Sequence, residues 1–483
     1  MIAALTPYPE MRDSGEEWLG RVPGHWEVRR LKTLSQIRYG LGQPPKEAAD
    51  GLPLIRATNV SRGEIVESDM VYVDPSDVPA GRNALLSEGE IIVVRSGAYT
   101  ADSAMIPMAY SGAVTGYDMV VTVTRALPEF IALALRADYV RDDQLVVAST
   151  RSAQPHLNAQ ELGDAFVLLP LLHEQTAIAR FLDDADRRIR RYIRAKERLI
   201  DLLEEQKQAV VHQAVTGQIN VRTGRPYPAY KDSGVEWLGE IPEHWGVVGL
   251  CYRYEQCLGK MLDGKRITGE YLLPYLRNVD VQWDDINVAN LPHMDIHPDE
   301  MARYTVRPGD LLVCEGGEVG RCAIWKGEIS PCGFQKALHR LRPRNYQRDR
   351  PRFLYYAFLL AVARSAFTDG HESTIAHLTG EKLRRHRFAF PCVDEQTAIV
   401  RFLDNATAAI SRTIELTRRQ ITLLREYRTR LTADVATGKL DVREAAANLP
   451  ETDPIAGRNR VETIQTEPRP NATEHDLAKG AIP

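Results

Sequence analysis

Arginine and amide side chains that could recognise DNA bases occur at similar places in two distant stretches of the chain. The first stretch, LIRATNV, contains Arg56 and Asn59, and the second, YLRNVDV, contains Arg277 and Asn278. Arginine can donate two hydrogen bonds to guanine in the major groove, and asparagine can pair in a similar way with adenine. Six further residues complete this set of DNA-contact candidates: Arg95, Tyr99, Tyr117, Arg321, Gln335 and Lys336. Because a surface contact or a scaffold hydrogen bond would explain any one of them equally well, the prediction rests on the set.

Motifs for catalysis are absent or weak. The chain has no G-x-x-x-x-G-K-[ST] loop and neither N-P-P-[YF] nor D-P-P-[YF], so we expect neither ATP hydrolysis nor methylation of bases by this chain. Glu205-Gln206-Lys207 resembles the E-x-K of a nuclease, but a charged helical face is the simpler interpretation. The glycine-rich EGGEVG at residues 315–320 lacks a following Lys-Ser and predicts a tight turn. We therefore expect no catalytic residue and no cofactor on this chain.

Cysteine spacing, composition and charge narrow the class of protein. The six cysteines form no C-x-x-C pair, so we expect buried thiols and no metal. With 44% hydrophobic and 26% charged residues, the composition is that of a globular protein, and neither a secretory signal nor a long apolar run is present. These features favour a cytoplasmic protein with no membrane contact. The net charge of −4 counts against a nucleic-acid partner only weakly, because a basic surface can be local.

Two motifs occur twice, about 220 residues apart, and indicate a tandem duplication. YPEMRDSGEEWLGRVPGHWEV at residues 8–28 returns as YPAYKDSGVEWLGEIPEHWGV at residues 227–247, and HEQTAIARFLD at residues 173–183 returns as DEQTAIVRFLD at residues 394–404. The first motif contains His25 in one copy and His244 in the other. Because no cysteine or serine nucleophile recurs with them, packing beside tryptophan is favoured over a catalytic pair.

Each half ends in a long stretch with heptad spacing, at residues 170–217 and 391–438. Apolar residues alternate three and four apart, which predicts the seam of a coiled coil, and a Thr-Gly pair ends each stretch. The copy within the same chain makes an intramolecular partner the expected one. The residues predicted to pack along these helices are Ile178, Leu182, Ile189, Leu199, Leu203, Val210, Ile399, Leu403, Ile410, Leu424 and Leu431.

Between motif and helix, each half has a mixed region of short strands and turns. Strands are predicted at IIVVRSG, MVVTVT and LLVCEGG, and short helices at residues 131–139 and 353–366. The two regions align only in islands: Leu54-Ile55-Arg56 with Tyr275-Leu276-Arg277, Gly89-Glu90-Ile91 with Gly309-Asp310-Leu311, Gly116-Tyr117 with Gly333-Phe334, and His156-Leu157 with His377-Leu378. We expect α/β globular domains at residues 1–165 and 246–388, helices at 166–217 and 389–442, a connector at 218–245 and a disordered tail at 443–483.

The twin DSGxEWLGxxPxHW motifs, the twin EQTAIxRFLD helices and the twin Thr-Gly terminators resemble the DNA-specificity subunit of type I restriction-modification systems. The resemblance covers nearly the whole chain up to about Val442. It implies two α/β target-recognition domains separated by two long antiparallel spacer helices, with no catalytic role. It also implies double-stranded DNA, two methylation subunits and two motor-nuclease subunits as partners, with S-adenosylmethionine, ATP and Mg²⁺ on those partners. The segment VRSGAYTADS departs from the EGGEVGRC of the second half.

The divergence of the two mixed regions favours an asymmetric, two-part DNA site whose halves are held apart by the helices. Two alternatives remain open. One is a specificity subunit of a complex that methylates without cleaving. The other, supported only by the acidic balance of the chain, is a coiled-coil scaffold whose globular parts bind proteins.

Overall fold

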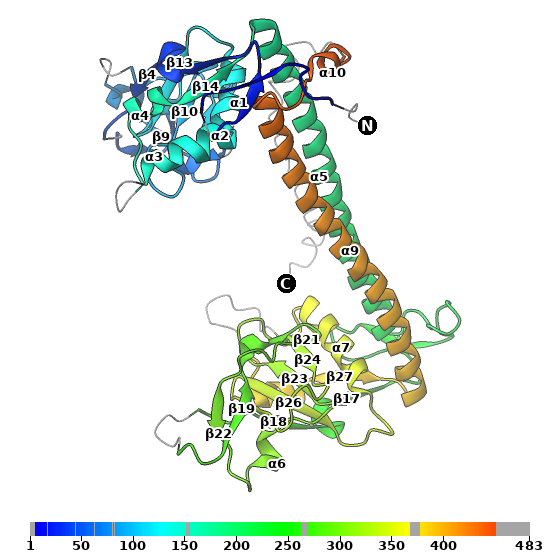
Figure 1. Cartoon of the computed structure of the whole chain (residues 1–483). Helices are drawn as coiled ribbons and strands as arrows, with labels where there is room; N and C mark the ends of the chain where they lie inside the picture. Colours follow the sequence, from blue (N-terminus) through cyan, green and yellow to red (C-terminus); the bar gives the residue numbers. More distant parts are fainter. Residues whose placement is uncertain are drawn as a thin grey trace, which may run out of the picture. The chain divides into compact units, whose positions relative to one another are not determined.

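The computed structural model describes residues 5–450 apart from 17, 44, 62, 80, 82, 151–154, 263–267 and 368–376. The chain forms two compact units, which we call unit 1 (Met1–Ile193 with Thr422–Pro483) and unit 2 (Arg194–Ile421). Each unit contains one mixed region together with parts of both long helices (Figure 1). Within the described ranges, no helix is both long and apolar enough to cross a membrane.

A four-stranded antiparallel sheet lies at the centre of each unit, with the order β11-β10-β13-β4 in unit 1 and β24-β23-β26-β18 in unit 2. The strands of unit 1 are β4 (Ser35–Tyr39), β10 (Ile91–Val93), β11 (Ser103–Met105) and β13 (Met119–Val123). Those of unit 2 are β18 (Tyr254–Leu258), β23 (Leu311–Cys314), β24 (Cys322–Ile324) and β26 (Leu338–Pro343). Strands β10 and β23 are buried along their whole length, which explains their unbroken apolar sequence. The strand predictions at IIVVRSG, MVVTVT and LLVCEGG are confirmed.

A second sheet and several short strand pairs surround the centre. The second sheet is β12-β6-β9-β5 in unit 1 and β22-β19-β25 in unit 2, and each contains one parallel pair, β6 with β12 or β19 with β25. Its strands are β5 (Glu47–Ala48), β6 (Leu52–Ile55), β9 (Val71–Val73), β12 (Val114–Thr115), β19 (Leu272–Leu276), β22 (His293–Asp295) and β25 (Gly333–Phe334). The two-stranded pairs are β1 (Met11–Asp13) with β2 (Arg21–Pro23), β3 (Glu27–Arg30) with β14 (Phe166–Leu169), β7 (Val60–Ser61) with β8 (Glu64–Ile65), β15 (Tyr230–Asp232) with β16 (Glu240–Pro242), β17 (Gly246–Gly249) with β27 (Arg387–Phe390), and β20 (Val281–Gln282) with β21 (Asp285–Ile286).

Helices pack on these sheets. They are α1 (Pro128–Arg136), α2 (Asp138–Val140), α3 (Val147–Ser149), α4 (Ala159–Asp164), α6 (Met301–Tyr304), α7 (Pro351–Ala363) and α8 (Gly380–Arg385), and a π-helical segment (Arg141–Val146) joins α2 to α3. Helices α1 and α7 correspond to the two predicted short helices but begin two or three residues earlier. The reason is a proline at the first helical position of each, where its fixed φ suits the helix.

The backbone pairing corrects one of the alignment islands. Thr115 pairs with Ile55 in β12 and β6, and Phe334 pairs with Leu276 in β25 and β19. Thr115 and Phe334 are therefore equivalent, so Gly116-Tyr117 corresponds to Gln335-Lys336 and not to Gly333-Phe334. The glycine followed by an aromatic residue is a chance likeness, because strand pairing decides which residues share a position.

The long helices α5 (Leu172–Val215) and α9 (Val393–Ala436) have 44 residues each and pack antiparallel. In unit 1, Arg428 forms an ion pair with Asp186. In unit 2, Lys196 lies 2.7 Å from Gln420 and Lys207 lies 3.0 Å from Ser411. Partner numbers fall on α9 as they rise on α5, so the expected antiparallel arrangement is confirmed.

The packing seam follows the predicted residues with one exception. Ten of the eleven residues predicted to pack are buried or half-buried, whereas Leu199 is 40% exposed. The prediction for Leu199 is wrong because the seam takes a step of four after Ile189. It runs through Ile193 and Ile200 and leaves Tyr192 and Leu199 on the outer face.

The repeated motif at residues 8–28 and 227–247 holds the starts of the long helices. In unit 1, Nε2 of His25 lies 2.8 Å from the carboxylate of Glu174 in the first turn of α5. In unit 2, Nε2 of His244 lies 3.1 Å from the carboxylate of Glu395 in the first turn of α9. An acidic residue also suits the positive end of a helix dipole. The recurring histidines therefore have a structural role.

The same motif receives the end of the other helix. Gly438 follows α9 with φ of +71°, and a Cβ there would overlap Pro23. Gly217 follows α5 with φ of +72°, and a Cβ there would overlap Pro242. Both the left-handed backbone and the close approach require glycine. Each copy of the motif thus joins the start of one long helix to the end of the other.

The glutamine of EQTAI ties each long helix to the globular part. Gln175 accepts a hydrogen bond of 2.8 Å from the backbone of Leu127, directly before α1. Gln396 accepts one of 2.8 Å from the backbone of Arg350, directly before α7. The glutamate and the glutamine of the motif thus each hold a helix end in both units.

The C-terminal segment is ordered further than predicted. Residues Arg443–Ala447 form α10, with Ala446 buried. The backbone of Asp441 donates to Thr6 at 2.8 Å, and the guanidinium of Arg443 lies 5.0 Å from the ring centre of Tyr8. The prediction of disorder is wrong for 443–450, because these contacts hold the segment to unit 1. The rest of the predicted tail, 451–483, lies outside the described residues.

Candidate nucleic-acid interface

A buried carboxylate locks the turn that leads into the central strand of each unit. In unit 1, Glu90 accepts hydrogen bonds from Arg38 at 2.7 Å and from the backbone of Ser87 at 2.9 Å. Burial raises the pKa of Glu90, but the hydrogen bonds, that from Arg38 first, leave it below its ordinary value. The carboxylate therefore stays charged and fixes the start of β10.

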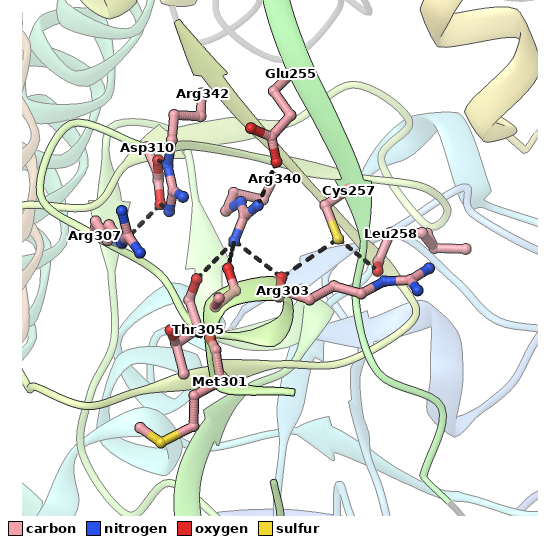
Figure 2. A network of polar contacts seen from close by, with 11 residues as sticks. Glu255, Cys257, Leu258, Met301, Arg303, Thr305, Arg307, Asp310, Arg340 and Arg342 are labelled. Atoms are coloured by element: carbon pink, nitrogen blue, oxygen red, sulfur yellow. Dashed lines mark hydrogen bonds and ion pairs between the residues drawn. The ribbon is translucent and has the colours of Figure 1, made fainter. Parts of the chain in front are cut away.

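In unit 2 the fully buried Asp310 has the same role (Figure 2). It accepts two hydrogen bonds of 2.7 Å from Arg342 and one of 2.7 Å from the backbone of Arg307. Arg342 is on β26, the strand next to β23, at the position that Thr122 occupies in unit 1. Arg38 comes instead from β4, one strand further away. The lock is shared, but its arginine has changed strand.

A second arginine is buried beside this lock in unit 2. Arg340, 1% exposed, donates to the backbone carbonyls of Arg303 at 2.9 Å and Thr305 at 2.8 Å, near the end of α6 (Figure 2). Arg340 also forms an ion pair of 3.1 Å with Glu255. Burial lowers the pKa of Arg340. Val120 stands at this position in unit 1, so the interior of the sheet has also diverged.

Just beyond β10, unit 1 places a guanidinium between two tyrosine rings. Cζ of Arg95 lies 4.7 Å from the ring centre of Tyr39 and 4.2 Å from that of Tyr117. Its Nη2 lies 3.0 Å from Nε2 of His156, and its backbone N–H donates to Asp118 at 3.1 Å. Both tyrosines are 44% exposed. We call Tyr39, Arg95, Tyr117 and His156 the unit 1 tip. Stacking fixes the plane of the guanidinium and presents a cation with aromatic faces.

Two further residues shape this tip. Tyr99 lies in the turn after Arg95 and is exposed, and the hydroxyl of Thr100 closes that turn by donating to the carbonyl of Gly97 at 2.7 Å. Asp118 is buried beneath the tip, and burial raises the pKa of its carboxyl to about 6. Of the unit 1 candidates, Arg95 and Tyr117 are in contact, and Tyr99 follows on the same loop.

The equivalent position in unit 2 has the opposite charge. The carbonyl of Glu315 accepts a hydrogen bond of 2.8 Å from Leu378, as that of Arg95 accepts one of 2.7 Å from Leu157. A cleft of about 330 Å³ opens here, and we call its lining the unit 2 tip: Leu262, Glu315, Gln335, Lys336 and Ala337. Within the part of the chain that the structure describes, the side chains of Glu315 and Gln335 have no protein hydrogen-bond partner.

Glycine allows the strands and loops of both tips to approach. A Cβ on Gly40 would overlap the carbonyl of Gly116, and one on Gly259 would overlap the carbonyl of Gln335. Any side chain at either position would push the loop away from the strand end. Both tips therefore depend on a glycine that directly follows the outer strand, β4 or β18.

Several candidate residues belong to the scaffold instead. Asn59 is fully buried, and its amide donates to the carbonyls of Val66 and Ser68 at 3.0 Å, so the prediction that it contacts bases is wrong. Arg56 donates to the carbonyl of Asp69 at 2.6 Å. The side chain of Asn59 therefore satisfies backbone carbonyl groups of the neighbouring loop.

In unit 2, Arg277 forms two hydrogen bonds with Asp280, of 2.9 and 2.8 Å. Asn278 donates to the carbonyl of Gly316 at 2.7 Å, and Arg321 donates to the carbonyl of Asn278 at 3.1 Å. These residues brace the turn that follows Glu315. Their place in the structure is that of supports, whereas Gln335 and Lys336 line the cleft.

Sequence reasoning missed three residues of the tips: Tyr39, His156 and Glu315. His156 belongs to an alignment island with His377, but nothing in the sequence indicated its contact with Arg95. Glu315 lies in the glycine-rich turn. Its equivalence to Arg95 could not be recognised in the sequence because the two loops have diverged. Tyr39 reaches Arg95 only because β4 pairs with β13, and no local spacing signals that pairing.

The two tips can bind but carry no sign of catalysis. Unit 1 offers donors and aromatic faces, and unit 2 offers an acceptor, an amide and an ammonium. Such groups at loop ends can hydrogen-bond to the edges of bases and stack on their faces. Among the described residues, no three His, Cys, Asp or Glu side chains gather in a way that could hold a metal ion.

A sequence model of the family "Type I restriction modification DNA specificity domain" matches residues 23–198 and 298–423, together more than half of the chain. The chain belongs to this family of DNA-specificity subunits. The resemblance inferred from the twin motifs is thus confirmed. The fold prediction of two mixed α/β units with a pair of long antiparallel helices is confirmed as well.

Relatives in this family are distant in sequence. The type I restriction enzyme EcoKI specificity subunit of Escherichia coli (strain K12) is 24% identical over 174 residues, covering 34% of this chain and 37% of that protein. The match thus spans little more than a third of that relative. The type I restriction enzyme StySPI specificity subunit of Salmonella potsdam is 22% identical over 464 residues, covering 91% of this chain and 94% of that protein.

A solved structure shares the fold. Its subject is the complex assembly and conformational transition of the type I R-M system, and one of its chains aligns with a TM-score of 0.68 at 18% identity. The alignment covers 87% of this chain and 99% of that chain. At this identity the likeness concerns the fold alone.

Proposed function

We propose that this specificity subunit reads a two-part, asymmetric DNA sequence, one part with each unit. The observation that carries the proposal is the pair of tips. The tips lie at equivalent strands of the two central sheets. One presents Arg95 against two tyrosines, and the other presents Glu315 beside Gln335. A conserved frame with opposite chemistry at one position is what two readers of different base sequences require.

Most of the affinity for DNA would come from elsewhere. The chain has a net charge of −4, and phosphate contacts normally supply the larger, sequence-independent share of binding. Lys336, exposed at the rim of the unit 2 cleft, is one such contact. Partner subunits would supply the others, so we expect specific binding by the assembled complex in preference to the isolated chain.

The helix pair would set the gap between the two parts of the site. A helix of 44 residues is about 66 Å long at about 1.5 Å per residue. At about 3.4 Å per base pair, this length corresponds to about 19 base pairs of DNA. Such a spacer supports a recognition sequence whose halves are separated by a fixed stretch that is not read.

The helix pair can be shortened without disturbing its packing. Lys196 faces Gln420, so residues 196–202 lie opposite residues 414–420. Removing both heptads keeps the seam in phase and shortens each helix by about 10 Å, or about three base pairs. We expect the gap of the recognised site to shrink accordingly, with the bases of both halves unchanged. A changed half-site at an unchanged gap would contradict the proposal that the length of the helix pair sets the gap.

Partners would dock on the outer face of the helices. In unit 1 this face carries the exposed Tyr192, Leu423 and Tyr427, and in unit 2 it carries the exposed Leu199, Leu202 and Leu416. Apolar groups of this size at a surface favour protein contacts. We propose one methylation subunit for each unit, each flipping an adenine and using S-adenosylmethionine, and two motor-nuclease subunits using ATP and Mg²⁺ in the cytoplasm.

Single-molecule methylation sequencing of the host tests the proposal. We expect one split motif with a methylated adenine in each half, and its complete loss when the gene for this chain is deleted. A deletion strain that keeps every methylated motif would refute the proposal. Challenge with unmodified phage DNA then separates a complex that cleaves from one that only methylates, because only the former restricts the phage.

A further inference from the structure

The position just beyond the central strand of each unit is where the chemistry of the tips differs most. Arg95 follows β10 and Glu315 follows β23, and the same backbone hydrogen bond, from Leu157 or from Leu378, fixes the carbonyl of each. The two side chains start from the same place in the frame and present a cation in one unit and an anion in the other. A substitution of this kind changes which hydrogen-bonding groups the tip can accept.

We propose that this position determines base specificity in each unit. Glu315 accepts a hydrogen bond from the exocyclic amino group of a cytosine or an adenine in the major groove, and Arg95 donates to the acceptors of a guanine. The proposal rests on the DNA-reading function proposed above. It deepens that function by assigning one base in each half of the site to one named residue.

The setting of Glu315 calls for a donor from outside. Its side chain is half-buried in the unit 2 cleft, and no described residue donates to it. A carboxylate that loses water without gaining a hydrogen bond is costly, so DNA seated on the tip must supply one. Cytosine N4 and adenine N6 are donors on the major-groove edge, whereas guanine O6 and thymine O4 are acceptors that a carboxylate repels.

The neighbours of Glu315 strengthen this selection. The apolar side chains of Leu262 and Ala337 line the same cleft and would displace water from a seated base. Gln335, with both a donor and an acceptor, stands beside the carboxylate without a partner among the described residues. Once a seated base displaces water from the cleft, a mismatched acceptor there becomes more costly.

Arg95 is arranged for the complementary task. Cζ of Arg95 lies over the rings of both Tyr39 and Tyr117, at 4.7 and 4.2 Å from their centres, so the two rings restrain its guanidinium. His156 occupies Nη2 at 3.0 Å and fixes the rotation of the group. A planar fork of donors matches N7 and O6 of guanine, the pair of acceptors that no other base presents in the major groove.

The test uses the complex of this chain with its methylation subunits and a library of DNA duplexes with every position of the site randomised. Glu315→Gln keeps the size of the side chain but adds a donor. We expect the preference for the amino-bearing base at one position of one half-site to fall about tenfold, with the other half-site unchanged. The wild-type library itself shows whether that base is cytosine or adenine.

Arg95→Lys is the matching change in unit 1. Lysine keeps the charge for a phosphate but loses the planar fork, so the preference for guanine at one position of the other half-site should fall about tenfold. The unchanged half-site in each experiment shows that the complex has folded and assembled. A uniform loss of affinity for all sequences, with base preferences retained, would overturn the assignment.

Glu318→Gln is the control. Glu318 lies in the same turn as Glu315, is exposed, and accepts a hydrogen bond of 2.6 Å from Nε1 of Trp283, which glutamine can also accept. We expect this variant to keep the wild-type base preferences at every position. If Glu315→Gln also leaves both half-sites unchanged, the assignment is wrong while the two-part site stands. If the wild-type complex itself shows no base preference, the proposed function fails.

Discussion

In unit 1 the central strand β10 leads to Arg95, stacked against two tyrosines, whereas in unit 2 the equivalent strand β23 leads to Glu315 in a cleft that Gln335 and Lys336 also line. The frame beneath the two tips has hardly changed. Both sheets have the same strand order, and both tips depend on a glycine after the outer strand, Gly40 or Gly259. Positions where backbone approaches backbone have been kept, and positions where a side chain meets solvent have drifted. The duplication therefore kept the strands and glycines that position each tip, and varied the side chains that the tip presents.

The buried carboxylates and their arginines have diverged more than these glycines but less than the tips. Glu90 and Asp310 occupy the same place, but their arginines, Arg38 and Arg342, come from different strands. Because both arginines reach the same buried charge, the interaction could survive while its partner moved. A buried charge must be paired, but the geometry of the sheet offers more than one place for the partner.

Breaking this lock should have the largest effect on stability. Arg342→Met leaves the fully buried Asp310 without its charged partner, and such a loss costs about 3 to 5 kcal/mol. We expect the free energy of unfolding of unit 2, measured by urea titration of the purified chain, to fall by that amount. Replacing the exposed Arg385, which pairs with Glu381 at 2.9 Å on α8, should change it by less than about 1 kcal/mol.

The comparison can be sharpened by moving the arginine in unit 1. Arg38→Met should destabilise unit 1, because Glu90 loses the bonds that lower its pKa. Adding Thr122→Arg places an arginine where unit 2 has Arg342 and should restore most of the loss. If the double variant is no more stable than Arg38→Met alone, the two locks are not equivalent.

The glycines after the long helices should come next in size. In Gly217→Ala and Gly438→Ala, a side chain enters the left-handed region and overlaps Pro242 or Pro23. Strain of about 1 to 2 kcal/mol and overpacking of a similar size predict a loss of about 3 kcal/mol in each unit. Thermal unfolding of the two variants should show equal losses.

Gly224→Ala separates the two causes. Gly224 has φ of +69° but no atom within 4 Å of its added Cβ, so only backbone strain applies. We expect it to cost about 1 kcal/mol. A cost as large as that of Gly217→Ala would mean that contact with the proline contributes nothing, and unequal costs at positions 217 and 438 would mean that the two copies of the motif do not hold the helices alike.

The same division between frame and tip explains what could be predicted from the sequence. The long helices were predictable because heptad spacing is local, and the twin motifs were conspicuous because the contacts of Gly217, Gly438 and the two histidines tolerate little change. The tips were not, because Tyr39 and Arg95 meet only through the pairing of distant strands. Asn59 looked like a base reader because its amide can serve a loop or a base, and only burial tells these roles apart.

The units should also differ in their response to pH. In unit 1, burial raises the pKa of Asp118 to about 6 from an ordinary value of 3.8. Between these values the folded state holds a proton that the unfolded chain has released, so unit 1 gains stability as the pH falls through 6. Leu338 occupies this position in unit 2 and does not titrate.

In unit 2, burial lowers the pKa of His386 to about 4 from 6.5. Here the unfolded chain binds a proton that the folded state refuses, so unit 2 loses stability as the pH falls below 6.5. Ala165 occupies the equivalent position in unit 1, where its carbonyl accepts the same backbone hydrogen bond as that of His386. The two units should therefore respond to acid in opposite directions.

Hydrogen exchange of peptides from each unit, corrected for the intrinsic effect of pH, can measure both responses. From pH 7 to pH 5 we expect unit 1 to gain about 1 kcal/mol and unit 2 to lose about 2 kcal/mol. Asp118→Asn should reduce the gain, and His386→Phe should reduce the loss, each without affecting the other unit. Parallel responses in the wild type, or a response in unit 2 that His386→Phe leaves undiminished, would show that other groups control the pH dependence. Opposite responses would place the difference between the units in their interiors as well as at their tips.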